Sequence, residues 1–340
     1  MSENTKNIHK HGTGGIMFAS ILLIIIALIS MIVTFSALKK SNDPAPDNGT
    51  EDSGEVENGE EDTPGENNNT DNTQNGDNQN TPPKNTVVTV KSSDVFKGPL
   101  LQINADHPYN RPVEEIIPPA EMEAMSPGDV LVKYGFVNMA SRSDGYFKPR
   151  IRRLFLNTAA ADAFYAMMKT YNEETGISYI QLTYAYVNSG LYSIKSTGFS
   201  VDLNIYDGGK TYPLYSLVSK YNTPQHYSWF INNCYKYGFI HIEDGRGSNN
   251  FSTFRYIGLP HSSYISSTPM SFDSYLDLIR TKTPDDRLVT VDANGDEWWV
   301  YYVPASSSDT TDIKVFGSQY TISGDNVSGF IVSVNTAGIK

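Results

Sequence analysis

The first clear pattern along the chain is an unbroken apolar run close to its start. Residues 16–38 carry no charged side chain and consist mainly of Ile, Leu, Met, Val, Phe and Ala. About 20 residues of this kind are enough to cross a bilayer as a helix. A cleaved signal peptide has a shorter apolar region and a small-residue cleavage site, neither of which precedes Lys39. We therefore predict one uncleaved transmembrane helix over 16–38, after a cytoplasmic tail over 1–15.

The charges on the two sides of this run do not orient the helix. Lys6 and Lys10 before the run are matched by Lys39 and Lys40 after it, so the positive-inside rule gives no direction. The bulk of the chain follows the helix, which favours an extracytoplasmic globular part. We therefore expect a single-pass protein of the cell membrane.

The segment after the helix is polar and acidic. Between residues 39 and 85 the composition is almost entirely Asn, Asp, Glu, Gly, Thr, Pro, Ser and Gln, with Val56 as the one large aliphatic side chain. Such a segment cannot bury enough apolar surface to offset the entropy cost of ordering, so we predict a disordered linker over 39–85. This linker holds most of the formal net charge of −12, so the low pI gives no information about a substrate. An acidic tail that binds a partner is the alternative.

Beyond the linker, helical and strand-like patterns alternate. Asn157 is a favourable N-cap for a helix that Gly176 ends, and its apolar residues fall on one face: Phe164, Met167, Met168 and Tyr171. Two further helices are predicted over 223–237 and from Ser271 to about Thr281. Strands are predicted over 177–187, 199–205, 239–242 and 254–257, because these runs are rich in β-branched and aromatic residues.

After Pro284 the pattern changes to short strand-like runs separated by turn residues: 287–291, 297–303, 312–316 and 330–334. Asn294-Gly295 is the pair favoured in type I′ hairpins, so we interpret residues 292–297 as a turn rather than a calcium-binding loop. We predict a small all-β module over 285–340. Its aromatic residues form either a packed sheet face, which strand aromatics favour, or a ligand platform: Trp298, Trp299, Tyr301 and Tyr302.

The composition offers few candidates for chemistry. Cys234 is the one cysteine and lies on an apolar helix stripe, so we predict a buried structural thiol and no intrachain disulfide. The histidines after the linker are isolated in sequence, a pattern typical of structural or surface positions: His107, His226, His241 and His261. The basic run at residues 150–153 is interpreted as a strand edge, and no nucleic-acid partner is predicted.

Five segments between about residues 92 and 281 nevertheless carry a resemblance: residues 98–109, the pair Met167-Met168, and residues 193–203, 229–240 and 254–261. Together they resemble the VanY-type D-alanyl-D-alanine carboxypeptidases, zinc peptidases that remove the terminal D-Ala of peptidoglycan stem peptides. It implies an α+β, D,D-carboxypeptidase-like domain over 86–284, with an antiparallel sheet and flanking helices. It also implies that the globular part is extracytoplasmic, where peptidoglycan lies.

The metal motifs of that family are altered in this chain. The family's first motif is S-x-H-x-x-G-x-A-x-D, and aligned on Ser193 it places Lys195 at the histidine while keeping Asp202. The second motif is E-P-W-H-F-R-Y-V-G, and aligned on the retained Phe-Arg-Tyr it places Asn250 at the glutamate and Thr253 at the histidine. The family's S-G-Y-R segment, whose arginine meets the substrate carboxylate, is replaced by residues 183–186, Thr-Tyr-Ala-Tyr.

These replacements remove most of the catalytic groups that the resembled family uses. Catalytic zinc takes three protein ligands and an open water position, and only Asp202 remains of the three. Asn250 cannot act as a general base, a role that typically contributes a factor of about 10² to 10⁴. We therefore predict no cofactor and no hydrolysis, and a cleft formed by Ser193, Lys195, Asp202, Thr253 and Arg255.

Lys195 suggests a substitute for the metal, an ammonium group paired with the remaining carboxylate of Asp202. On this hypothesis Lys195→Ala destabilises the fold; neutral drift of an unused site is the equal alternative.

Three functions remain open at this point. The first is a non-catalytic protein that binds a stem peptide or an envelope protein, held by its one membrane helix. The second is an active zinc D,D-carboxypeptidase, whose displaced ligands join Asp202 from His241, His261 or Glu243. The third is a structural scaffold.

Overall fold

The computed structural model describes residues 85–112, 116–124, 134–188, 193–214, 223–242 and 253–339. All of them fall within one compact unit of the chain. The predicted transmembrane helix and the predicted linker, except for its last residue, lie outside the described residues. Within the described part, no helix is both long enough and apolar enough to span a membrane.

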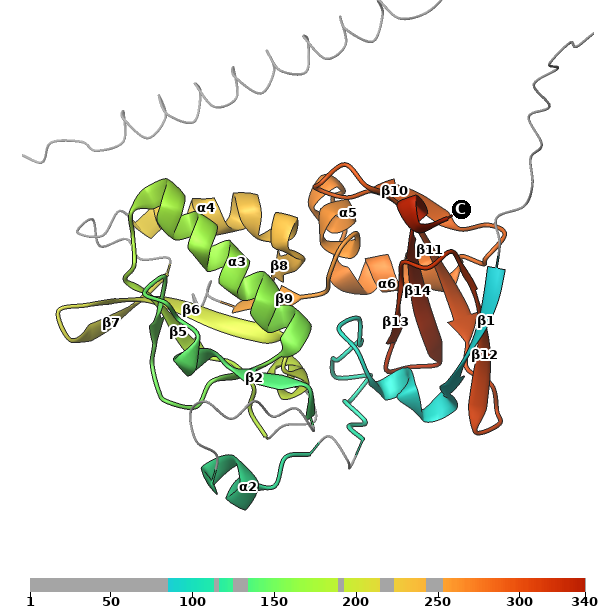
Figure 1. Ribbon diagram of the computed structural model, residues 1–340, viewed down its shortest axis with the longest axis horizontal. Coiled ribbons are helices and arrows are strands. Elements are labelled where there is room, and N and C mark those ends of the chain that lie inside the picture. The colour runs from blue at the N-terminus through green and yellow to red at the C-terminus, as the bar shows by residue number, and fades with distance from the viewer. Residues whose placement is uncertain are drawn as a thin grey trace, which may run out of the picture. The chain divides into compact units, whose positions relative to one another are not determined.

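A six-stranded sheet carries three of the predicted site residues, Asp202, Thr253 and Arg255 (Figure 1). Its strands lie in the order β3-β5-β6-β9-β8, and β7 also pairs with β6. The β3–β5 pair is parallel and the other pairs are antiparallel, so the sheet is mainly antiparallel, as predicted. The strands are β3 (Lys148–Pro149), β5 (Ile180–Tyr184), β6 (Ser200–Asp207), β7 (Lys210–Pro213), β8 (Phe239–His241) and β9 (Thr253–Tyr256).

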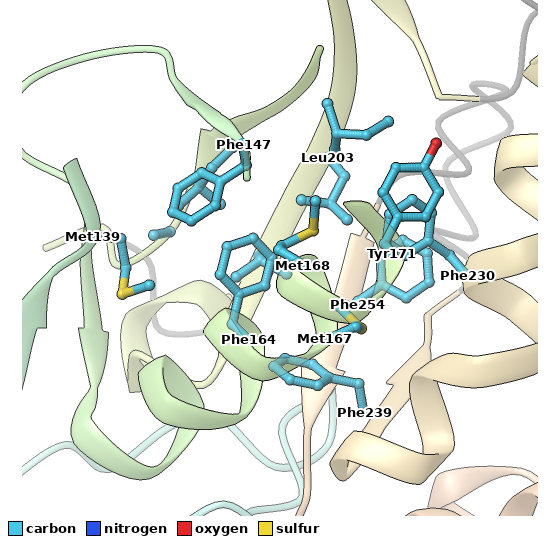
Figure 2. Packing of buried hydrophobic residues seen from close by; sticks show 14 of the residues in the cluster. Met139, Phe147, Phe164, Met167, Met168, Tyr171, Leu203, Phe230, Phe239 and Phe254 are labelled. Carbon is cyan, nitrogen blue, oxygen red and sulfur yellow. The ribbon is translucent and has the colours of Figure 1, made fainter. Parts of the chain in front are cut away.

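Helix α3 (Thr158–Thr175) covers one face of this sheet. Asn157 caps the helix by accepting a hydrogen bond from the Ala159 amide, and Gly176 ends it in the left-handed conformation with φ of 70°. The predicted apolar face is fully buried, and its residues pack against the sheet and helix α4 (Thr223–Asn233) (Figure 2): Phe164, Met167, Met168 and Tyr171 with Leu203, Phe230, Phe239 and Phe254. The helical period therefore predicted the core correctly.

The second predicted helix is divided in two. Helix α4 (Thr223–Asn233) is followed by a 3-10 turn, η7 (Cys234–Tyr237), which Gly238 ends with φ of 81°. Cys234 is buried in the core, and burial raises the pKa of its thiol to about 12. The thiol is therefore protonated and structural, as predicted.

Short elements complete this part of the fold. Strands β2 (Phe136–Asn138) and β4 (Phe155–Asn157) pair antiparallel before α3. Helix α2 (Pro119–Ala124) precedes these strands, and helices α5 (His261–Ser267) and α6 (Phe272–Arg280) follow β9. Ser271 caps α6 as expected, whereas α2 and α5 are too short for a clear helical period.

The C-terminal residues form a four-stranded antiparallel sheet in the order β10-β11-β14-β13. These strands are β10 (Leu288–Val291), β11 (Glu297–Pro304), β13 (Tyr320–Gly324) and β14 (Gly329–Asn335). Strand β12 (Thr310–Phe316) pairs along its whole length with β1 (Asn85–Lys91), the first described segment of the chain. The first described strand of the chain therefore pairs with a strand of the C-terminal module.

The turn between β10 and β11 differs from the predicted type. A type I′ turn needs positive φ at both central residues, but Asn294 does not have positive φ, whereas Gly295 has φ of 89°. The Gly295 amide donates to the Asp292 carbonyl at 3.1 Å. This is a three-residue loop with a left-handed glycine rather than a type I′ turn. The Asp292 carboxylate accepts hydrogen bonds from the amides of Asn294 and Asp296 and from the Trp298 indole. These bonds fix the loop and occupy the carboxylate that a calcium site would need.

The aromatic residues of β11 pack on both faces of the strand and do not form an open platform. Tyr301 and Tyr302 are buried, and the Tyr301 hydroxyl donates to the Lys314 carbonyl at 2.6 Å. Trp299 packs edge-on against Phe316, and the Arg287 guanidinium lies 3.6 Å from its ring centroid. The packed alternative is therefore the observed one.

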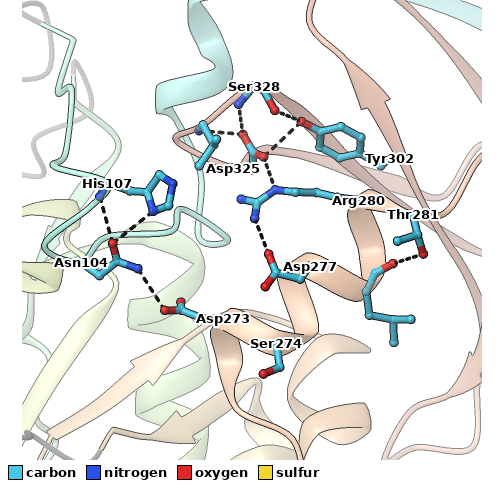
Figure 3. Close-up of polar contacts among 12 residues, drawn as sticks. Asn104, His107, Asp273, Ser274, Asp277, Arg280, Thr281, Tyr302, Asp325 and Ser328 are labelled. Atoms are coloured by element: carbon cyan, nitrogen blue, oxygen red, sulfur yellow. Dashed lines mark hydrogen bonds and ion pairs between the residues drawn. The ribbon is translucent and has the colours of Figure 1, made fainter.

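A buried carboxylate, Asp325, joins the C-terminal sheet to α6 (Figure 3). One oxygen accepts the amides of Val327, Ser328 and Gly329 at 2.8, 2.8 and 3.0 Å. The other oxygen accepts from Arg280 Nε at 3.0 Å and from the Tyr302 hydroxyl at 3.1 Å. Its backbone carbonyl accepts the Gln102 amide, so the same turn also holds the segment that begins at Gly98.

His261 makes a second buried connection. Its Nδ1 lies 2.6 Å from the Tyr275 hydroxyl of α6, and its Nε2 lies 2.9 Å from the Ser333 hydroxyl of β14. Burial lowers the pKa of His261 to about 3, so the ring is neutral at neutral pH.

His261 should make the protein less stable in acid. In the unfolded chain its pKa is about 6.5, so between pH 6.5 and pH 3 the unfolded state binds a proton that the folded state does not. The stabilisation is complete above pH 6.5 and falls toward pH 3 with a slope of up to about 1.4 kcal/mol per pH unit. Urea denaturation at several pH values should show a shallower slope for His261→Gln than for the wild type. Equal slopes would contradict this role.

Candidate functional site

Strands β6 and β9 position the retained acidic residue. Val201 and Leu203 are buried against α3, so Asp202, which lies between them, points to the opposite face of the sheet. Thr253 is the cross-strand partner of Asp202 in β9 and shares its face. The Thr253 hydroxyl donates to Asp202 Oδ1 at 2.8 Å, and both residues are buried. One carboxylate oxygen is therefore occupied by a hydroxyl.

A tight turn brings Lys195 to the other oxygen. The 3-10 turn η5 (Ile194–Thr197) begins at Ser193, whose hydroxyl accepts the Lys195 amide, and ends at Gly198 with φ of 76°. A Cβ at Gly198 would lie 2.2 Å from the Phe136 ring, so this position requires glycine. Lys195 Nζ lies 2.5 Å from Asp202 Oδ2. The structure therefore brings Lys195, Asp202 and Thr253 together, with Ser193 as a backbone cap.

These residues do not fit a catalytic zinc ion. Both oxygens of Asp202 have partners, and the two histidines of the resembled motif are replaced by a cation and a hydroxyl that donates. Among the described residues, no group of three His, Cys, Asp or Glu side chains is arranged to hold a metal ion. Asn250 and Glu243 lie outside the described residues.

The two described histidines of the displaced-site hypothesis do not join Asp202. His241 is the cross-strand partner of Phe254, and the two rings lie 5.4 Å apart. Phe254 belongs to the core under α3, so His241 lies on the face opposite Asp202. His261 uses both ring nitrogens in contacts with Tyr275 and Ser333. In this structure neither histidine therefore lies with Asp202, as the displaced-site alternative would require.

Arg255 does not line an open cleft, which corrects its predicted role. The residue is only 2% exposed, and its Nη2 donates to the carbonyls of Pro99 and Leu101 at 3.0 and 2.6 Å. Its guanidinium also lies 4.5 Å from the Phe272 ring centroid. Burial lowers the pKa of Arg255 to about 10, so it stays charged at neutral pH. Arg255 therefore anchors the segment at residues 98–102 to the sheet.

Two residues beside Asp202 were missed from the sequence. Tyr184 of β5 is the cross-strand partner of Asp202, and its side chain is exposed. Its ring centroid lies 5.4 Å from Lys195 Nζ and 5.0 Å from the Arg150 guanidinium carbon. The basic run that contains Arg150 was visible, but only the pairing of β3 with β5 brings it to this site.

The chain was compared with known proteins by sequence and by structure. No protein-family model matches the sequence. A D-alanyl-D-alanine carboxypeptidase of Enterococcus faecium is 24% identical over 260 residues, which cover 72% of this chain and 78% of that protein. The solved structure of the vancomycin-resistance D,D-dipeptidase VanXYg, in complex with a D-Ala-D-Ala phosphinate analogue, matches with a TM-score of 0.53 at 18% identity. That match covers 74% of this chain and 99% of the dipeptidase, so the two share a fold.

Proposed function

We propose that this chain, a relative of the VanY-type D,D-peptidases in sequence and in fold, binds D-Ala-terminated stem peptides of peptidoglycan without hydrolysing them. The observation that carries the proposal is the contact between Lys195 and Asp202 at the expected metal position. The shared fold and the relative's carboxypeptidase activity support peptidoglycan peptides as the ligand class.

The charges at the site explain why a metal would not bind. An ammonium group already neutralises Asp202, and a divalent ion at the same place would meet a like charge. Two unit charges 4 Å apart repel by about 4 kcal/mol at an effective dielectric constant of about 20, and a divalent ion roughly doubles that repulsion. Zinc binding would therefore have to displace Lys195 and then rely on one carboxylate.

The site also lacks the groups that would activate a water molecule. Thr253 donates its hydroxyl proton to Asp202, and Lys195 is a protonated donor in its ion pair. Neither can accept a proton from water at neutral pH. The residues assembled here are hydrogen-bond donors around one neutralised carboxylate, an arrangement that suits binding rather than hydrolysis.

The test uses the purified full chain and the peptide N-acetyl-L-Lys-D-Ala-D-Ala. Calorimetry should detect binding, D-Ala release should stay at the level of a protein-free blank, and elemental analysis should find no stoichiometric zinc. Zinc-dependent release of D-Ala by zinc-loaded protein would overturn the proposal in favour of the alternative, an active D,D-carboxypeptidase. Absence of binding would overturn it in favour of a scaffold or of an envelope-protein partner.

We also propose that the globular part is held outside the cell membrane by the apolar helix over residues 16–38. Its length and composition support this location, as does a ligand that lies outside the cell. The full chain should stay in the membrane fraction after alkaline carbonate washing. Recovery in the soluble fraction would contradict this location.

A further inference from the structure

An irregularity in β5 exposes one aromatic side chain beside Asp202. The β5–β6 register runs regularly to Leu182, which pairs with Leu203, and then shifts so that Tyr184 pairs with Asp202. Two residues of β5 thus oppose one residue of β6, the count of a β-bulge, and bulges re-aim side chains next to functional sites. Ile180 to Thr183 are buried, whereas Tyr184 is 45% exposed. The bulge therefore presents Tyr184 on the Asp202 side of the sheet.

Two cations contact this exposed ring. The Arg150 guanidinium carbon lies 5.0 Å and Lys195 Nζ 5.4 Å from the Tyr184 centroid, both within cation–π range. Arg150 follows the end of β3, and its amide donates to the Leu182 carbonyl at 3.0 Å, which fixes its backbone beside the bulge. Lys195 is fixed by the turn η5 and by Asp202. The Arg150 backbone and the Lys195 side chain are thus held in place.

The charges of Arg150, Lys195 and Asp202 sum to one positive charge. Lys195 is paired with Asp202, but no ion pair to a carboxylate is found for Arg150 among the residues that the structure describes. Arg150 and Tyr184 are both exposed. A guanidinium presents five N–H donors in a fork that matches a carboxylate, and an ammonium presents three donors. One positive charge and several donors therefore face solvent at this point.

We propose that Arg150, on the Tyr184 ring that Lys195 also contacts, binds the C-terminal carboxylate of the peptide ligand. Because Lys195 neutralises the Asp202 carboxylate, Asp202 does not repel the carboxylate of the ligand. This inference rests on the proposed function, because it assigns a residue to the recognition of the same peptide.

The test compares two ligands that differ only at the terminus, N-acetyl-L-Lys-D-Ala-D-Ala as the free acid and as the C-terminal amide. Hydrogen bonds to charged groups contribute about 1.5 to 3 kcal/mol, so the acid should bind the wild type roughly 10-fold to 100-fold more tightly than the amide. Arg150→Gln should remove this preference. Arg152→Gln, an exposed arginine of the same run, is the matched control and should retain it.

The outcomes separate this inference from the proposed function. If the wild type binds neither peptide, the proposed function is wrong and the inference is wrong with it. If the wild type binds acid and amide equally, or if Arg150→Gln keeps the preference, the inference alone is wrong. Thermal unfolding of both variants checks that the loss of preference is not a loss of fold, and the acid-to-amide ratio is a readout that general destabilisation would not change.

Discussion

Asp325→Ala lowers the free energy of unfolding by about 3 to 5 kcal/mol, the cost typical of removing one member of a buried ion pair. The substitution leaves three turn amides and the Tyr302 hydroxyl without their acceptor. It also leaves the Arg280 guanidinium without its buried partner. Urea denaturation measures the change as a lower midpoint at an unchanged slope.

Asp277 is a matched control, because it contacts the same Arg280 guanidinium. Asp277 accepts from Arg280 Nη1 at 3.0 Å, but its side chain is 70% exposed, whereas that of Asp325 is fully buried. Exposed ion pairs contribute about 0 to 1 kcal/mol, so Asp277→Ala should have a small effect. A similar loss for the two variants would show that burial does not set the strength of this contact.

Lys195→Met should cost about 2 to 4 kcal/mol of stability, because it keeps the aliphatic stem but leaves the buried Asp202 carboxylate with only the Thr253 hydroxyl. Adding Asp202→Asn to this variant should restore part of the loss, since no buried charge then remains unpaired. The coupling between the two positions, measured by denaturation of the single and double variants, should exceed about 1 kcal/mol. Additive effects would instead favour neutral drift of the site.

Local signals predicted the three longest described helices, α3, α4 and α6, because the information for them lies within a few residues. Asn157, Gly176 and Ser271 act as the caps that their residue types favour, and the apolar period of α3 identified its buried face. The turn at Asp292 shows the limit of such rules. Its Asn-Gly pair favours one turn type, but the hydrogen bonds of the Asp292 side chain stabilise another.

Long-range pairing was not predictable in the same way. The sequence of β1 gives no sign that it pairs with β12, because the two strands are far apart along the chain. The short strand β13 was missed as well, although it pairs with β14 over its whole length. Neighbouring strands select one another through side-chain packing across the sheet, which no single segment contains.

The sequence by itself determined which residues stand at positions 195, 202 and 253, and the family resemblance predicts that Asp202 is a kept metal ligand and that Lys195 and Thr253 stand at histidine positions. Only the tertiary structure decided what those side chains do. The register of β6 with β9 aims Thr253 at Asp202 and turns His241 to the opposite face. The bulge in β5 and the parallel β3 bring Tyr184 and Arg150 to the same place. The residue type determines the chemical groups at a position, whereas the strand register determines the face of the sheet on which the side chain lies. Register depends on strands that are distant in sequence.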